Sequence, residues 1–241
     1  MNNKKTKSAL VIGGSGDIGQ AIVRKLTSKN FKVISTYLNN NKMKSKEINY
    51  IKCDVLDNKS INNLISIINK QYNEIDVIIF SVSPKVQNKK IFDIEWDEIE
   101  IHFRTQVMSI FKLIKSLKSQ FDKKYKTKII VVSTEYCIGK PPKGLTHYIL
   151  SKYAALGLSK SLAIELAEYN STVNIIMPGM VDTKLLDNLP PKLIELTAYN
   201  NPLKRIATVN DVASLVSFLS SEESDYLNGA IIPINGGSVL I

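Results

Sequence analysis

Tyr148 and Lys152 lie four residues apart in a stretch whose pattern predicts a helix over residues 148–169, so both side chains share one helix face. The pairing has a chemical use, because a phenol with the ordinary pKa of about 10 is a slow acid and base near neutrality. An ammonium group beside the phenol stabilises the phenolate and lowers its pKa. Since many helices carry this spacing by chance, the pair indicates proton-transfer chemistry only if other segments support it.

A glycine-rich segment lies between the first predicted strand and the first predicted helix. Its glycines at positions 14, 16 and 19 match the general dinucleotide-binding fingerprint. Glycines there permit a tight turn and a close approach of the backbone to a pyrophosphate, and the helix that follows offers N–H groups and a positive dipole end. From this segment we expect cofactor contacts at Gly13, Ser15, Gly16, Asp17, Ile18 and Gly19.

The end of the second predicted strand lacks the acidic residue that usually binds the ribose hydroxyls of NAD. Tyr37 occupies that position, with Asn39 and Asn40 after it and Lys42 and Lys44 nearby. No carboxylate is present to repel a 2′-phosphate, and amide or ammonium groups can bind one. The segment therefore favours NADP(H) over NAD(H), with Tyr37 and Asn39 as cofactor contacts.

Asp54 and Val55 follow the third predicted strand and are further candidate cofactor contacts. The Asp54 carboxylate is placed to accept a hydrogen bond from the amino group of an adenine ring. A second interpretation is nearly as well supported: aspartate is also a common turn-capping residue, because its carboxylate accepts from nearby backbone N–H groups.

Apolar strand-like runs alternate with amphipathic helical stretches along the chain. This alternation predicts an α/β fold of the Rossmann type, a doubly wound and mostly parallel sheet with helices on both faces, formed by residues 1–241 as a single domain. The predicted strands are 8–12, 31–37, 50–53, 75–80, 128–133, 172–177 and 230–234, and the predicted helices are 18–28, 61–71, 96–117, 148–169 and 210–219.

The composition argues against several classes of partner. The net charge is +10, but only three of the 32 basic residues are arginines and the lysines are spread along the chain. We therefore expect no nucleic acid, since its recognition relies on the arginine fork; an acidic partner stays open. Cys53 and Cys137, the two cysteines, suggest neither a disulfide framework nor a metal site and favour a reducing cytoplasm. No run approaches the roughly 20 apolar residues of a membrane span.

Several segments in the right order resemble the classical short-chain dehydrogenase/reductase family over essentially the whole chain. The Tyr-x-x-x-Lys motif of that family matches Tyr148 to Lys152, and its Pro-Gly-x-x-x-Thr matches Pro178 to Thr183. The carboxyl-terminal third also matches in order, at residues 202–205, 211–213 and 228–237.

The resemblance implies a role for each matching residue. Tyr148 would give a proton to a carbonyl oxygen while hydride arrives from a nicotinamide, and Lys152 would hold the nicotinamide ribose and lower the pKa of Tyr148. The substrate-orienting serine of the family falls at Thr134, counted from the preceding strand, with Ser133 as the alternative. The segment with Pro178, Gly179, Val181 and Thr183 would bind the carboxamide of the cofactor.

Three departures from the family pattern concern the cofactor site and the proton relay. Asp17 replaces the middle glycine of the phosphate motif, and residues 80–83 replace an Asn-Asn-Ala-Gly segment, leaving Ser81 as the expected cofactor contact there. The helix asparagine that supports the relay aligns with Gln106. These changes motivate one alternative, a dinucleotide-binding sensor without turnover, although Tyr148 and Lys152 are intact.

The segment between Thr183 and Arg205 is apolar and interrupted by prolines, which suits either a lid over an acyl chain or an ordinary surface helix. The leading interpretation is an NADP(H)-dependent carbonyl reductase acting on a 3-oxoacyl thioester, with a sugar or polyol dehydrogenase as the alternative. Enoyl reductases on this fold are disfavoured because they place six residues between Tyr and Lys, which here pairs Tyr148 with Ala155. The resemblance also implies a homo-oligomer, a tetramer or a dimer.

Overall fold

The computed structural model describes residues 6–39, 45, 47–187 and 189–240. Asn40, Lys42 and Lys44, which were expected beside the adenosine end of the cofactor, therefore lie outside the described residues. The assignment of residues 1–241 to one domain stays a prediction.

Seven parallel strands form one sheet in the order β3-β2-β1-β4-β5-β6-β7. From β1 the chain adds strands first toward one edge of the sheet, through β2 and β3, and then toward the other edge, from β4 onward. In open α/β sheets, ligands bind at the carboxyl ends of the strands where this order changes side. The doubly wound fold class is confirmed. The strands are β1 Ser8–Ile12, β2 Lys32–Tyr37, β3 Ile48–Lys52, β4 Val77–Phe80, β5 Lys128–Val132, β6 Thr172–Pro178 and β7 Ile231–Ile234.

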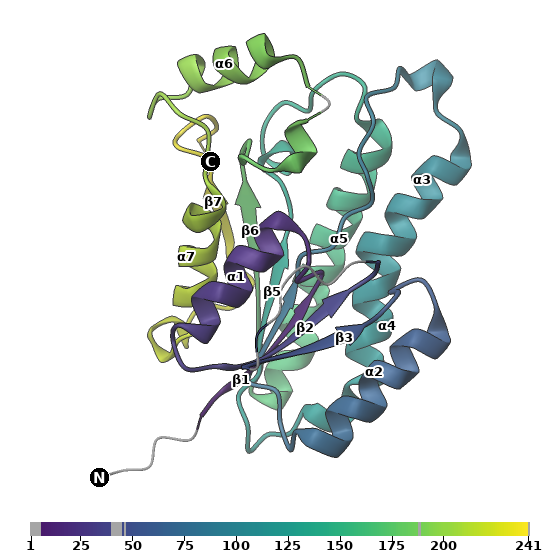
Figure 1. The fold of residues 1–241 in the computed structure, drawn as a ribbon, viewed down its shortest axis with the longest axis vertical. Helices are drawn as coiled ribbons and strands as arrows, with labels where there is room; N and C mark the ends of the chain where they lie inside the picture. The colour runs from purple at the N-terminus through teal and green to yellow at the C-terminus, as the bar shows by residue number, and fades with distance from the viewer. Residues whose placement is uncertain (1–5, 40–44, 46, 188, 241) are drawn as a thin grey trace.

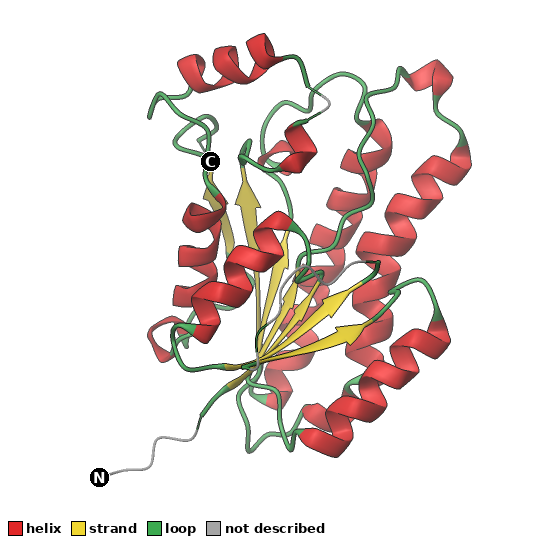
Figure 2. Cartoon of the chain, viewed as in Figure 1, coloured by secondary structure: helices red, strands yellow, loops and turns green. Residues whose placement is uncertain are grey.

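Helices cover both faces of the sheet (Figure 1). One face carries α1 and α7, and the other carries α2, α4 and α5, with the yellow sheet between red helices in Figure 2. The short helix α6 stands beyond the carboxyl ends of β6 and β7 (Figure 1). The helices are α1 Asp17–Thr27, α2 Asn58–Gln71, α3 Trp96–Phe103, α4 Ser109–Ser116, α5 Thr146–Glu165, α6 Pro191–Asn200 and α7 Val209–Leu219.

The central strands read as nearly continuous apolar runs because both of their faces are buried. In β1, Leu10 and Ile12 pack into the core beneath α2, α4 and α5, whereas Ala9 and Val11 pack into the core beneath α1 and α7. Successive side chains of a strand point to opposite faces, so one short run supplies both cores. The predicted strand ends differ from the observed ones by at most two residues.

The helix predicted over residues 96–117 is not one regular helix. A five-residue π-helical segment, Arg104–Met108, separates α3 from α4. A π turn is one wider turn inside an otherwise continuous helix, so the residues on either side of it both show a helical pattern. The sequence pattern therefore could not reveal it. Gln106 lies in the middle of this segment and is buried.

The helix that carries Tyr148 also begins earlier than predicted. α5 starts at Thr146, which brings His147 into its first turn, and it continues as a 3-10 turn over Leu166–Tyr169. Asn170 ends the turn in the left-handed conformation, with φ of 56°. Among the described helices, none has the length and apolar character needed to cross a bilayer.

Candidate functional site

The phosphate loop connects the carboxyl end of β1 to the start of α1, and its glycines are required by its shape. Gly13 has φ of +83°, and a Cβ there would lie 2.7 Å from the backbone oxygen of Ser81. A Cβ at Gly19 would lie 2.2 Å from the backbone oxygen of Gly13. The turn therefore closes against the start of α1 only because side chains are missing at both positions.

The start of α1 fits a phosphate group. Its N-cap is Gly16, so no side chain caps the helix, and a Cβ on Gly16 would meet nothing nearer than the Gly13 oxygen at 3.6 Å. The first-turn N–H groups of Asp17, Ile18 and Gly19 thus face an open position beside Ser15, which suits the pyrophosphate of a dinucleotide.

The Asp17 carboxylate already has a hydrogen-bond partner within the protein. It accepts a hydrogen bond of 2.8 Å from the backbone N–H of Lys184, which begins the segment after Thr183. The residue that replaces the family glycine therefore joins the phosphate loop to the segment that leads to α6. Its predicted contact with the cofactor stays a prediction.

At the adenosine end, Tyr37 is half-buried at the last position of β2, and Asn39 is exposed two residues later. Asp54 uses one carboxylate oxygen to accept from the N–H of Leu56 at 2.8 Å, which is the turn-capping role. Val55 is half-buried and packs part of its side chain against the core beneath α2.

Lys152 is buried beside Tyr148 on α5. Its ammonium group donates to the backbone oxygen of Val132 at the end of β5 over 3.0 Å, and lies 5.5 Å from the centroid of the Tyr148 ring. Burial lowers the pKa of Lys152 to about 8. The four-residue spacing in the sequence thus becomes a direct contact between the cation and the phenol ring.

The acidity of Tyr148 differs from the expectation. Burial raises the pKa of Tyr148 above its ordinary value, and a hydrogen bond with the Thr134 side chain opposes that rise. The sequence argument considered only the attraction of a nearby cation, whereas removal of the phenolate from water is the larger effect here. Tyr148 is therefore held in its protonated form, as a proton donor requires.

The two hydroxyl groups after β5 point to different partners. Thr134 contacts Tyr148 through its hydroxyl and also accepts from the N–H of Tyr136 at 3.4 Å. The Ser133 hydroxyl faces the sulfur of Cys137 at 3.9 Å. This geometry favours Thr134 over Ser133 as the group that meets a substrate carbonyl.

Gln106 connects the π-helical segment to the site. Its amide nitrogen donates to the Ser83 hydroxyl over 3.0 Å, and its amide oxygen accepts from the Ser151 hydroxyl at 3.1 Å. Ser151 immediately precedes Lys152 on α5. Gln106 therefore ties the loop after β4 to α5.

The residues predicted to contact the nicotinamide lie where β4 and β6 finish. Ser81 donates its backbone N–H to Ile12 over 2.9 Å, which keeps the loops after β1 and β4 together. After β6, the Thr183 hydroxyl donates to the backbone oxygen of Val181 over 3.3 Å. Pro178 is buried as the last residue of β6, and Gly179 donates its N–H to Ile234 over 3.0 Å.

Three buried polar residues near Tyr148 were not singled out from the sequence. His102 on α3 and His147 on α5 have rings in edge-to-face contact, and Glu135 follows Thr134 directly. His147 could have been found as the neighbour of Tyr148, and His102 as the residue one turn before Gln106. The sequence shows that Glu135 follows Thr134, but only the folded structure shows that Glu135 is buried.

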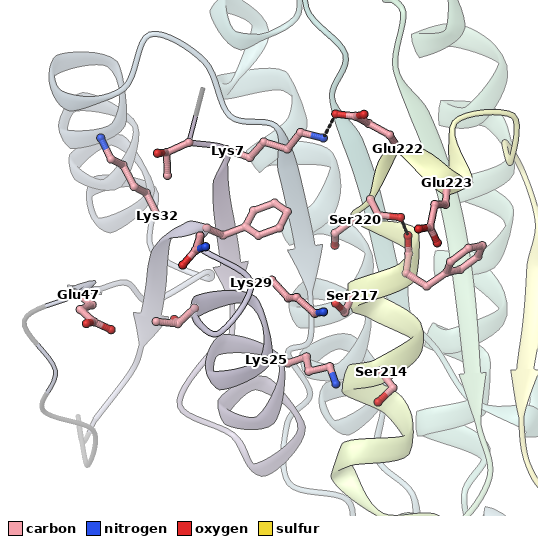
Figure 3. A pocket seen from close by; sticks show the side chains of 16 residues that line it. Lys7, Lys25, Lys29, Lys32, Glu47, Ser214, Ser217, Ser220, Glu222 and Glu223 are labelled. Atoms are coloured by element: carbon pink, nitrogen blue, oxygen red, sulfur yellow. Dashed lines mark hydrogen bonds and ion pairs between the residues drawn. The ribbon is translucent and has the colours of Figure 1, made fainter. Parts of the chain in front are cut away.

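A cavity of about 1120 Å³ lies at the amino end of the sheet, opposite the carboxyl end that carries Tyr148 and the phosphate loop (Figure 3). It is lined where β1 and β2 begin and where α1 and α7 end. Lys25 and Lys29 reach across it toward α7 (Figure 3), and Lys7 pairs with Glu222 at 3.0 Å. Because lysines complement the negative end of a helix dipole, this lining has a structural explanation and is separate from the dinucleotide site.

This chain is similar to known proteins along nearly its whole length. A family model described as enoyl-(acyl carrier protein) reductase matches residues 14–238. A 3-oxoacyl-[acyl-carrier-protein] reductase of Buchnera aphidicola subsp. Acyrthosiphon pisum is 31% identical over 249 residues, which cover 99% of this chain and 100% of that protein. A crystal structure of a short chain dehydrogenase family protein from Francisella tularensis has a TM-score of 0.87 at 31% identity, covering 97% of this chain and 99% of that one.

The chain belongs to the short-chain dehydrogenase/reductase family. Members of this family are oxidoreductases that use a nicotinamide dinucleotide, so this chain is one that interconverts a carbonyl and an alcohol. A further similar structure is the ligand-free aldohexose dehydrogenase of Thermoplasma acidophilum, with a TM-score of 0.89 at 25% identity over 97% of this chain and 94% of that one.

Exchanging the two hydroxyl groups after β5 tests their assignment in this short-chain dehydrogenase/reductase. Thr134→Val should lower kcat by about 100-fold, because it removes a donor aimed at the developing oxyanion while keeping the side-chain shape. Ser133→Ala should change kcat by less than about threefold. Steady-state rates of NAD(P)H oxidation measure both variants, and the opposite ranking would move the role to Ser133.

Proposed function

We propose that this oxidoreductase uses NADPH to reduce the 3-oxo group of an acyl thioester. The observation that carries the proposal is the convergence of Thr134 and Lys152 on the half-buried phenol of Tyr148. A carbonyl oxygen placed there would meet two hydroxyl donors at once. The bound nicotinamide would supply the hydride.

Tyr148 gives its proton to the carbonyl oxygen as that oxygen gains negative charge. Its raised pKa keeps it protonated before the reaction, and the nearby ammonium of Lys152 stabilises the phenolate that forms. Thr134 orients the carbonyl through its hydroxyl. Lys152 would also hold the nicotinamide ribose, and Thr183 with the backbone near Val181 would hold the carboxamide.

The preference for NADPH rests on the end of β2. No carboxylate stands at Tyr37 or Asn39 to repel a 2′-phosphate. The open N-terminus of α1 binds phosphate in either cofactor, so the discrimination depends on the segment after β2.

The acyl thioester rests on two observations. The relatives named as 3-oxoacyl-[acyl-carrier-protein] reductases match nearly the full chain. Beyond Thr183, the short turn Lys184–Leu186 and α6 expose Leu185, Leu193 and Leu196 above the carboxyl end of the sheet. Exposed leucines on a short segment suit a lid that closes on an acyl chain, and the net charge of +10 would favour an acidic carrier.

A sugar or polyol substrate is a second candidate, favoured by Glu135. This carboxylate is buried next to Thr134 and accepts from the Ser238 hydroxyl. It lines a cavity of about 380 Å³ with Gly179, Met180 and residues 235–238. A buried carboxylate near the reacting group would accept hydroxyl donors of a sugar, as the similarity to an aldohexose dehydrogenase also suggests.

The helices α3, α4 and α5 support a homo-oligomer, either a dimer or a tetramer. Their outward side exposes large apolar side chains that a second copy would cover: Phe103, Phe111, Leu150, Tyr153 and Ile164.

The thiols of Cys53 and Cys137 are buried and free, which fits the reducing cytoplasm.

A substrate panel separates the two candidates. Acetoacetyl thioesters of coenzyme A and of an acyl carrier protein, together with aldohexoses and polyols, would be assayed by NAD(P)H absorbance. We expect the thioesters to have a kcat/KM at least 100-fold above that of the sugars. Activity with sugars alone would replace the proposal by the second candidate.

Tyr148→Phe should lower kcat by at least about 1000-fold and leave the Kd for NADPH within about twofold, because only the proton donor is removed. Tyr226→Phe is the control, because the Tyr226 side chain is fully exposed, and its kcat should not change. Fluorescence titration gives the Kd. Retained turnover in Tyr148→Phe would contradict the assignment of Tyr148 as the acid.

Titration of the wild-type protein by fluorescence should show a Kd for NADPH at least tenfold below that for NADH, since a 2′-phosphate would gain contacts without meeting a carboxylate. Replacing Asn39 by Asp should reduce or reverse this ratio, because the new carboxylate repels the phosphate and accepts from ribose hydroxyls. Equal affinities in the wild-type protein would remove the argument built on Tyr37 and Asn39.

A further inference from the structure

The chain contains two histidines, and the fold brings both of them together beside the catalytic tyrosine. His102 from the last turn of α3 is 2% exposed, and His147 from the first turn of α5 is 3% exposed. Their ring centroids are 4.8 Å apart at an interplanar angle of 67°. The contact joins two helices that are more than 40 residues apart in the sequence.

On its inner side the histidine pair contacts the ring of Tyr148. The His102 ring lies edge-on to the Tyr148 ring, with the centroids 6.1 Å apart. The pKa of His102 is lowered to about 4, mainly by burial and also by the charges of His147 and Lys152, whereas Glu98 opposes the shift. His102 is therefore neutral at working pH and lies within the electrostatic reach of Lys152.

Each of the two imidazoles has a buried ring nitrogen without a hydrogen-bond partner among the described residues. These nitrogens are the Nδ1 atoms of His102 and His147. An unpartnered polar nitrogen inside a helix interface is unfavourable, and an apolar side chain of similar size would pack there without that cost. A neutral imidazole carries one donor and one acceptor nitrogen, so it can take a proton on one side and release one on the other.

The outer side of the pair leads to the surface at Glu98. This half-buried carboxylate lies one turn before His102 on α3 and forms an ion pair of 2.7 Å with Lys89. Burial lowers the pKa of His147, which Glu98 raises and Lys89 lowers, so both charged groups act on the second imidazole. A half-exposed carboxylate, two buried imidazoles and the phenol thus follow one another from solvent to site.

We propose that His147 and His102 form a proton relay that returns a proton from solvent near Glu98 to Tyr148 after each turnover; this rests on the proposed reduction. In each cycle Tyr148 loses one proton to the alcohol oxygen. His102 gives a proton toward the phenolate and recovers one from His147, which recovers one from solvent. One proton enters per alcohol formed, and neither histidine changes its oxidation state.

The relay predicts a difference between the first turnover and the later ones. In His102→Phe, the single-turnover rate of NADPH oxidation should stay within about twofold of the wild-type rate, because Tyr148 starts protonated. Its steady-state kcat should fall by about 10- to 100-fold with a larger solvent deuterium isotope effect, since reprotonation becomes limiting. Phenylalanine keeps the edge-on ring contact, so a purely packing role would leave kcat unchanged, and that result would overturn the relay.

Glu98→Gln and Glu100→Gln form the matched pair for the outer end. Both carboxylates lie on α3, and glutamine at position 98 can keep the capping interaction with Glu95, whereas Glu100 pairs only with Arg104 among the described residues. Glu98→Gln should lower kcat by threefold or more, and Glu100→Gln should leave it unchanged. Equal effects of the two variants would remove Glu98 from the path.

A measurement without substrate keeps the relay testable if the thioesters prove not to be substrates. With two histidines in the chain, nitrogen-15 NMR resolves each imidazole, and His102→Phe assigns the signals. The relay requires imidazole N–H protons to exchange with solvent rapidly despite burial, on the millisecond scale of turnover. Slow exchange at His102 would overturn the relay, whereas inactivity of the wild-type protein on thioesters with rapid exchange would overturn only the proposed substrate.

Discussion

The buried ammonium group of Lys152 is the constraint on which the site depends. A cation removed from water is tolerated only with partners, and here the backbone oxygen of Val132 supplies one at 3.0 Å. That contact fixes α5 against the end of β5, where Thr134 begins the next loop. Tyr148, one turn before Lys152, is thereby held over the point where β4, β5 and β6 end. The position of the phenol follows from the need to accommodate the cation.

The groups around this cation form a polar layer between apolar cores. Gln106 bridges Ser83 and Ser151, so the loop after β4 and the catalytic helix share one side chain. The π-helical segment that carries Gln106 places it inside the interface instead of on the core surface. Below this layer the sheet is apolar on both faces, and a polar group displaced in that direction would lose its partners.

The two ends of the sheet differ in the helix termini that they present, because all the strands are parallel. At the carboxyl ends, the open N-terminus of α1 offers N–H groups to a phosphate. At the amino ends, the carboxyl-terminal ends of α1 and α7 meet lysines in the larger cavity. Parallel strands with connecting helices orient these helix dipoles alike, so helix N-termini gather at the carboxyl ends of the strands and helix C-termini at the amino ends.

The amino-acid sequence by itself determined the fold class, the phosphate loop and the Tyr148–Lys152 pair, because each depends on local spacing: apolar periodicity, glycines in one turn, and two residues on one helix face. From the end of the predicted strand over residues 128–133 it also predicted Thr134, with Ser133 as the alternative, and that role stays a prediction. Only the tertiary structure decided the contacts between distant segments. These include the pairing of His102 with His147, the bond from Asp17 to Lys184 and the π turn at Gln106. Burial, which exists only in the folded chain, also reversed the expected direction of the Tyr148 pKa.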